Sequence, residues 1–147
     1  MVIFIVKVPI PRKIRNWENG KKETIVIRIK RLLCKDCNKS FSILPWFIPP
    51  HRSYDWNYQE LAIQLFLNSQ SIKTISGKYI IHSITIKRWL LSLVKDFAIH
   101  YRCLINFPGL KAPDTGPDID KFWKQLLHEH NLKNIMSILH SQKIAIP

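Results

Sequence analysis

Residues Ile75 to Trp89 read Ile-Ser-Gly-Lys-Tyr-Ile-Ile-His-Ser-Ile-Thr-Ile-Lys-Arg-Trp and carry the strongest fold signal in the chain. The apolar residues of this stretch have the spacing of two short helices that pack against each other. The expected seam between these helices consists of Ile75, Tyr79, Ile81, Ile86 and Trp89. Ser76 is the small residue that lets the helices approach. The pattern therefore predicts a helix-turn-helix.

Five residues of the second helix and its start are left facing outward: His82, Ser83, Ile84, Lys87 and Arg88. In a helix-turn-helix this region enters the major groove of DNA. Lys87 and Arg88 can reach guanine edges or phosphates. Ser83 can donate to a phosphate, and Ile84 can pack on a thymine methyl. Two lysines of the first helix, Lys73 and Lys78, are expected to contact phosphates, with an ordinary solvated face as the alternative.

The same stretch resembles the helix-turn-helix of insertion-element transposases, which has the order Ile-Ala-x-x-Leu-Gly-Ile-Ser-x-x-Thr-Val-x-Arg-Trp. The matching residues are Ile75, Ser76 (for Ala), Tyr79, Ile81, Thr85, Ile86, Arg88 and Trp89. Ile80 replaces the turn glycine, and a β-branched residue with positive φ costs about 1 kcal/mol or more. His82 replaces the capping serine, so we expect Ser83 to cap the helix one residue later.

The net charge of +13 is concentrated near the N-terminus. Residues 1–52 hold 12 Lys and Arg against 3 Asp and Glu, whereas residues 108–147 hold 5 against 4. Clustered basic charge favours a polyanionic partner. A lysine-rich composition of the whole chain is the competing explanation, but it does not account for the shortage of acids in the first segment.

Three cysteines give no even disulfide framework and indicate a reducing compartment. The apolar opening Met1–Val8 is interrupted by Lys7 and lacks the features of a signal peptide. The longest apolar runs are too short to span a membrane. We therefore expect a cytoplasmic protein without a membrane partner.

Strand periodicity occupies the first third of the chain and helical periodicity the rest. Ile25, Ile27 and Ile29 alternate with polar residues over Thr24–Leu33, and Asn19-Gly20 predicts a hairpin back to Lys7–Trp17. A short third strand is expected over Phe41–Leu44. Helices are expected from Ser53 or Asp55 to Asn68, over Ser71–Tyr79, over Ser83–Leu104, and after Asp118 as one or two short helices. The inner face of the first helix should hold Trp56, Tyr58, Leu61 and Leu65.

Cys34 and Cys37 form one Cys-x-x-Cys pair after the basic strand. Two such thiolates take two corners of a tetrahedral zinc site, as in the second knuckle of a zinc ribbon. Residues 1–33 contain neither Cys nor His, and the remaining candidates, His51 and Cys103, lack ribbon spacing. The chain is therefore expected to hold no cofactor, or zinc at this pair. A vestigial half-site and one completed by additional upstream sequence both remain open.

Over roughly residues 12–104 the chain is similar to uncharacterised bacterial proteins with a transposase-like zinc ribbon and a helix-turn-helix, associated with mobile elements. The resemblance rests on the basic strand, Arg31-Leu-Leu-Cys34-Lys-Asp-Cys37, Leu44-Pro45-x-Phe47-Ile48-x-Pro50-x-Arg52-x-Tyr54 and Thr85-x-x-Arg88-Trp89. It implies a ribbon-plus-helices fold, a DNA partner and a location at the bacterial nucleoid. Members of that group carry a complete zinc site, and this chain does not.

Catalytic constellations are missing from the sequence. The ten acids do not suggest a metal-carboxylate site, and four glycines leave little room for a phosphate-binding loop. His128-Glu129-His130 places adjacent residues on different sides of a helix, so we expect a plain surface there. We therefore expect no enzymatic activity.

The sequence thus predicts an α+β protein, with a basic β-ribbon over residues 1–52, a helix-turn-helix domain over 53–107 and a C-terminal loop with short helices over 108–147. Double-stranded DNA is the expected partner, bound by the second helix with help from the ribbon residues Arg12, Lys13, Arg15, Arg28, Lys30 and Arg31. A homodimer and a catalytic partner acting in trans are both compatible with this function. The alternatives are a protein-interaction or RNA-binding adaptor and a non-functional remnant of a mobile element.

Overall fold

The computed structural model of the chain describes residues 2–45 and 53–141. It has an α+β fold, as the sequence predicts, and in the described residues a three-stranded antiparallel sheet precedes six helices. The chain divides into two compact units, Met1–Tyr58 and Gln59–Pro147. We call them the ribbon unit and the helical unit and describe each by itself. The segment 46–52, which includes Phe47, Ile48, Pro50 and Arg52 of the resemblance and the candidate ligand His51, lies outside the described residues.

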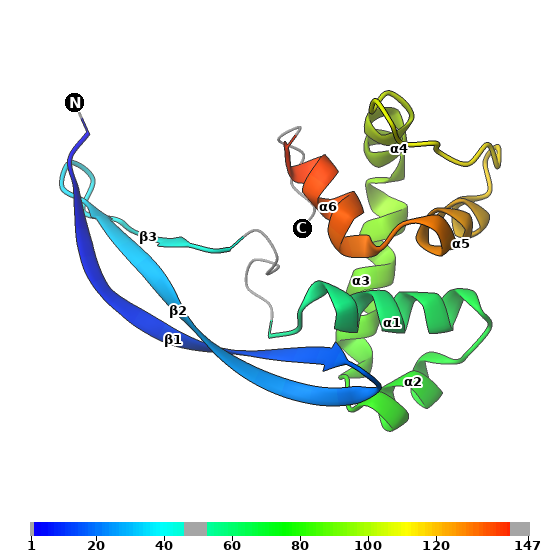
Figure 1. The fold of residues 1–147 in the computed structure, drawn as a ribbon, viewed down its shortest axis with the longest axis horizontal. Helices are drawn as coiled ribbons and strands as arrows, with labels where there is room; N and C mark the ends of the chain where they lie inside the picture. Colours follow the sequence, from blue (N-terminus) through cyan, green and yellow to red (C-terminus); the bar gives the residue numbers. More distant parts are fainter. Residues whose placement is uncertain (1, 46–52, 142–147) are drawn as a thin grey trace. The chain divides into compact units, whose positions relative to one another are not determined.

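The ribbon unit is built on a long hairpin of β1 (Phe4–Glu18) and β2 (Lys21–Cys34), to which β3 (Ser40–Ile43) adds beside β2 (Figure 1). The predicted turn at Asn19-Gly20 is confirmed, because both residues have positive φ (51° and 74°) and Glu18 pairs with Lys21. The register shifts between Lys7 and Ile10. This irregularity contains Pro9, which has no N–H to donate to the ladder.

One face of the hairpin is buried in its middle part. Ile29 is 2% exposed and Ile14 is fully buried, while Ile27 is half-buried. Ile25, one step closer to the turn, is 36% exposed, so the predicted inner face extends over only part of β2. The segment around Tyr54 pairs with the outer edge of β1 at Arg15. Arg15 N donates to Ser53 O at 2.7 Å, and Arg15 O accepts from Asp55 N at 2.9 Å.

The six helices are α1 (Trp56–Leu67), α2 (Ile72–Tyr79), α3 (Ser83–Lys95), α4 (Phe97–Ile105), α5 (Ile119–Glu129) and α6 (Leu132–Ser141) (Figure 1). Two predicted caps are confirmed: Asp55 Oδ1 accepts from Tyr58 N, and Asp118 Oδ1 accepts from Lys121 N, both at 2.9 Å. The prediction of one helix over Ser83–Leu104 is wrong. Asp96, with φ −103° and ψ 16°, ends α3 and precedes α4.

The core of the helical unit is formed by aliphatic and aromatic side chains from all its helices. The fully or almost fully buried ones are Ala62, Ile63, Ile75, Ile81, Ile86, Trp89, Leu104, Phe122, Trp123, Leu126, Leu132, Ile135 and Leu139. On α1 the prediction is half right, since Trp56 and Tyr58 are buried but Leu61 and Leu65 are only half-buried. Ala62 and Ile63 take the inner positions instead.

A histidine is buried in this core without a polar partner. His100 of α4 is fully buried, and neither ring nitrogen has a hydrogen-bond partner among the described residues. Its ring meets that of Trp123 edge-on, with the centroids 6.1 Å apart. Burial lowers the pKa of His100, and the nearby Asp96 carboxylate opposes this effect in part.

The described residues include no helix that is both long enough and apolar enough to cross a membrane.

Candidate nucleic-acid interface

Helices α2 and α3 are joined by a three-residue connection, Ile80–His82, and pack against each other. Ser71 caps α2 by accepting from Thr74 N at 3.1 Å. At the end of α2, Ile80 adopts the left-handed conformation with φ 55° and ψ 46°. The sequence pattern required a positive φ at this position, and the chain adopts it with a β-branched residue.

The expected seam between α2 and α3 is present. Four of its five residues are at most 1% exposed, and Tyr79 is half-buried; the four are Ile75, Ile81, Ile86 and Trp89. Ser76 contributes more than its small size, because its Oγ donates to Ile81 O at 2.7 Å. This hydrogen bond ties the connection back to α2 and fixes the direction in which α3 leaves.

All five residues predicted to face outward are exposed: His82, Ser83, Ile84, Lys87 and Arg88. Lys87 and Arg88 form no salt bridge within the described parts of the chain. The first turn of α3 contains no acid, so the positive end of the helix dipole is not neutralised by its own side chains. This end of α3 is therefore an exposed, positively charged surface.

The predicted cap of α3 is wrong. His82 is the N-cap residue, and its side chain makes no capping hydrogen bond. Ser83 already belongs to the helix, since the N–H groups of Thr85 and Ile86 both donate to His82 O, at 2.9 and 3.2 Å. The helix thus begins one residue too early for Ser83 to cap it.

The outer face of α3 extends further than the predicted residues. Leu91 is 64% exposed and Val94 is 49% exposed, and they continue the stripe that begins at Ile84 and runs through Arg88. The spacing of seven residues between Ile84 and Leu91 could have indicated this continuation from the sequence. The second half of this face therefore combines two exposed apolar side chains with the exposed Lys95.

The two lysines of α2 are both exposed. Lys73 lies in the first turn of the helix and Lys78 in its last turn. Lys78 Nζ lies 5.3 Å from the centre of the Tyr79 ring, within the range of a cation–π contact.

The basic residues of the ribbon unit divide between its two faces. Arg28 and Lys30 share one face of β2 and are exposed, and Lys13 lies on the same face of β1 because it pairs with Val26. Arg12, which pairs with Ile27, and Arg31 belong to the opposite face. Arg31 is half-buried, and its Nε is buried without a hydrogen-bond partner in the described chain.

Arg15 lies on the face of Lys13 but is engaged within the unit. Its Nη1 donates to Tyr54 Oη at 2.7 Å, and its guanidinium carbon lies 5.1 Å from the centre of that ring. Tyr54 and Trp17 both pack edge-on against Tyr58, with centroid distances of 5.2 and 5.6 Å. This arginine therefore anchors an aromatic cluster.

The cysteine pair lies at the other end of the hairpin from the Asn19-Gly20 turn. Cys34 ends β2 and is buried, whereas Cys37 in the following turn is exposed. The backbone N–H and the thiol of Cys37 form hydrogen bonds to Cys34 and lower the pKa of Cys34. Within the described residues, no group of three or more His, Cys, Asp and Glu side chains gathers as metal ligands would.

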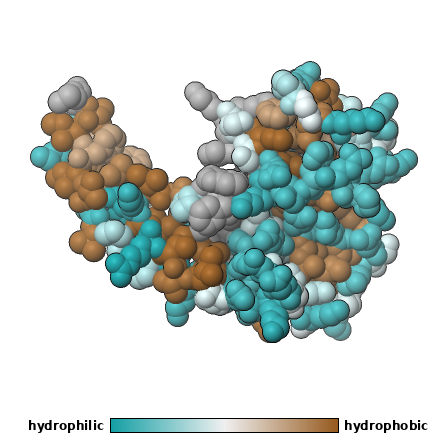
Figure 2. Space-filling model, viewed as in Figure 1, coloured by the Kyte–Doolittle hydropathy of each residue, from teal (hydrophilic) through white to brown (hydrophobic). Residues whose placement is uncertain are grey.

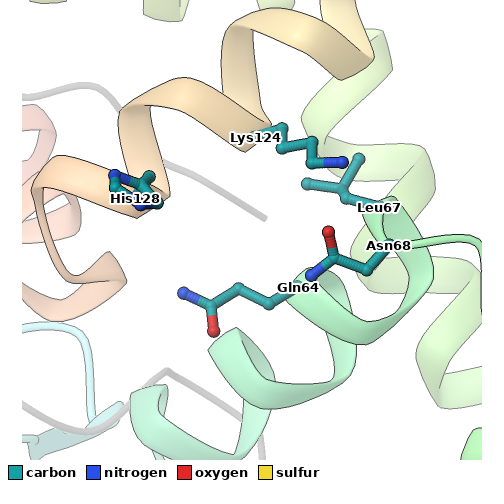
Figure 3. Close-up of a pocket in the computed structure, with 5 residues that line it drawn as sticks. All are labelled: Gln64, Leu67, Asn68, Lys124 and His128. Atoms are coloured by element: carbon teal, nitrogen blue, oxygen red, sulfur yellow. The ribbon is translucent and has the colours of Figure 1, made fainter.

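A small hollow lies between α1 and α5 of the helical unit. It has a volume of about 180 Å³ and is lined by Gln64, Leu67, Asn68, Lys124 and His128 (Figure 3). Ligand pockets usually measure about 300 Å³ or more. Gln64 Nε2 is already used, since it donates to Glu60 Oε1 at 3.0 Å and to Leu127 O at 3.3 Å. This hollow has no group of side chains arranged for catalysis.

A small α+β protein with a basic ribbon and an exposed, basic helix start is thus the class that the structure defines. Residues 8–89 match a family described as a domain of unknown function (DUF6431), and the chain belongs to this family. The match runs from β1 through α2 and ends at Trp89, so it includes the whole seam between α2 and α3. No curated protein and no solved structure matches the chain.

Proposed function

We propose that this protein binds double-stranded DNA through a helix-turn-helix formed by α2 and α3, with α3 in the major groove. The observation that carries the proposal is the contrast along α3: Ile86 and Trp89 are buried, while Lys87 and Arg88 between them are exposed. Burial of the seam fixes which side of the helix faces outward. Basic residues on that side suit guanine edges and phosphates.

The surroundings of α3 support the same function. The uncapped, acid-free start of α3 offers backbone N–H groups and a positive dipole to a phosphate. Lys73 and Lys78 of α2 add exposed positive charge for sequence-independent contacts. On the ribbon, Lys13, Arg28 and Lys30 form a second basic surface on one face.

In this proposal the chain resembles the DNA-recognition part of a transposase and has no catalytic domain of its own. It would act in the bacterial cytoplasm, at the nucleoid, with any DNA chemistry supplied by a partner in trans. A protein-interaction adaptor is the second candidate, and the exposed Leu91 and Val94 on the same face of α3 favour it.

Fluorescence anisotropy with a labelled duplex, selected from a random pool by the wild-type protein, tests the proposal. Arg88→Ala is expected to weaken binding by about 1–3 kcal/mol, because a bidentate contact to a base is lost. In a salt series, Lys87→Ala/Arg88→Ala should reduce the slope of log K against log salt by about 1, since the phosphate contact of Lys87 is removed together with the base contact of Arg88.

Lys121→Ala/Lys124→Ala on α5 is the matched control, because it removes the same charge from two exposed positions of the same unit. It should leave the affinity within about twofold of wild type. Equal losses in the two double variants would show that only net charge matters and would remove α3 from the interface. Failure of the wild type to select any duplex would favour the adaptor.

A further inference from the structure

One face of the sheet in the ribbon unit carries positive charge and, within strands β1 to β3, no acid. Arg28 and Lys30 of β2 lie on it, and we call it the Lys30 face. Side chains alternate along a strand and directly paired residues share a face, so the register assigns each side chain to a face. Both acids of the hairpin, Glu18 and Glu23, lie on the opposite face. The cations of the Lys30 face, all exposed, are Lys13, Arg15, Lys22, Arg28 and Lys30. This separation of charge favours an anionic partner.

Exposed aromatic and aliphatic side chains lie on the same face. Phe41 of β3 and Phe4 of β1 flank β2, and their rings meet edge-on with the centroids 6.3 Å apart. The two rings are 47% and 49% exposed. Three aliphatic side chains of this face are 50–70% exposed: Val6, Val26 and Ile43. Figure 2 shows hydrophobic residues along the ribbon in brown, with hydrophilic ones in teal between them.

The register interleaves the two kinds of side chain. Ile43 is the cross-strand partner of Lys30, and Val26 is the partner of Lys13. Between Leu32, which pairs with the aromatic residue of β3, and Val26 the surface extends along β2 for about 20 Å, at about 3.3 Å per residue. Sheet surfaces that bind a few nucleotides of a single strand combine cations and aromatic rings in this way.

The exposed rings favour a single strand over a duplex on this face. In a duplex the bases are stacked on one another, so their faces are not free to contact a phenyl ring. A single strand leaves its base faces open, and these stack on aromatic side chains while the neighbouring cations bind the phosphates. A protein partner with an apolar surface would cover the rings but leave the adjacent cations unpaired.

We propose that the Lys30 face binds single-stranded nucleic acid, with bases stacked on Phe41 and Phe4 and phosphates bound by Lys13, Arg28 and Lys30. The binding is non-covalent, and it is tolerant of sequence because every base has a π-face. The site belongs to the ribbon unit and is independent of the duplex binding proposed for α3.

Fluorescence anisotropy of the full chain with labelled single strands tests the proposal. The strands are about 12 nucleotides long, have a mixed sequence that cannot pair with itself, and are made as DNA and as RNA. Binding is expected with a slope of log K against log salt near −2, because three cations each contribute about −0.7. The tighter of the two strands identifies the class of nucleic acid. Failure of both strands to bind at low salt would overturn the proposal.

Substitutions at Phe41 separate stacking from general apolar contact. Phe41→Leu removes the ring but keeps an apolar side chain, and it should weaken binding by about fivefold or more. Phe41→Tyr keeps the ring and should remain within about twofold of wild type. Both variants are expected to fold, because Phe41 is 47% exposed, and circular dichroism checks this. Equal affinity of wild type and Phe41→Leu would contradict stacking at this position and overturn the proposal.

Paired charge variants locate the site on one face. Arg28→Ala/Lys30→Ala should weaken binding and reduce the slope by about 1.4. Lys7→Ala/Lys21→Ala is the matched control, because it removes the same charge from exposed positions on the opposite face of the sheet. This control should stay within about twofold of wild type, and so should the α3 variant Lys87→Ala/Arg88→Ala, which separates this site from duplex binding. A loss in either of these pairs as large as that of Arg28→Ala/Lys30→Ala would overturn the proposal.

Discussion

Replacing Ile80 by glycine should stabilise the helical unit. The backbone at Ile80 is left-handed, with φ 55° and ψ 46°, which costs a β-branched residue about 1–2 kcal/mol. Glycine avoids this cost but adds about 0.5–1 kcal/mol of unfolded-state entropy. Ile80 is 67% exposed, so little apolar burial is lost. The expected net gain in the free energy of unfolding is about 0.5–1 kcal/mol.

Urea unfolding followed by circular dichroism measures this gain as a higher midpoint at an unchanged slope. Thermal unfolding should show an increase of about 2–4 °C for each kcal/mol. Ile84→Gly is the matched control, because Ile84 is 51% exposed but lies within α3. It should lose about 0.5–1 kcal/mol. If the two glycine variants are destabilised to the same extent, the left-handed conformation of Ile80 carries no strain and the reasoning is refuted.

Three further variants probe the same unit. His82→Ser should gain about 0.5–1 kcal/mol, measured by urea unfolding, because the N-cap of α3 now makes no side-chain hydrogen bond. Ser76→Ala should lose about 1 kcal/mol with the 2.7 Å bond to Ile81 O, and an unchanged midpoint would contradict that role. The folded-state pKa of His100 is lowered, so its contribution to stability is present above about pH 6.5 and is lost as the pH falls through the lower folded-state value. His100→Leu should therefore flatten the fall in unfolding free energy between about pH 7 and pH 5, relative to wild type.

Local signals in the sequence were sufficient at the hairpin turn and at the starts of α1 and α5, but not at the start of α3. Asn19-Gly20 predicts the hairpin because both residues tolerate positive φ, and Asp118 predicts the start of α5 because its carboxylate accepts from Lys121 N. The seam between α2 and α3 was also predictable, since Ile75 and Ile86 are apolar at helical spacing.

Features set by packing between distant elements were not predictable. Neither Pro nor Gly marks the break between α3 and α4 at Asp96. After this break, His100 and Leu104 of α4 are buried, and α4 packs against α6. On α1 the small Ala62 is buried in place of Leu61, because the neighbouring helices determine which side is covered. The division of the ribbon arginines between two faces required the register, which places Arg31 opposite Lys7.

The start of α6 depends on a side chain far away in the sequence. Glu60 Oε2 accepts from Leu132 N at 2.7 Å, across 72 residues, and satisfies one of the N–H groups that a helix start leaves unpaired. The family match ends at Trp89, yet Glu60 lies inside the matched region and its partner lies beyond it. A fragment cut at the family boundary would leave this half-buried carboxylate without its donor. The cooperative folding unit is therefore longer than the segment that defines the family, and a nascent chain can complete it only after α6 has been synthesised.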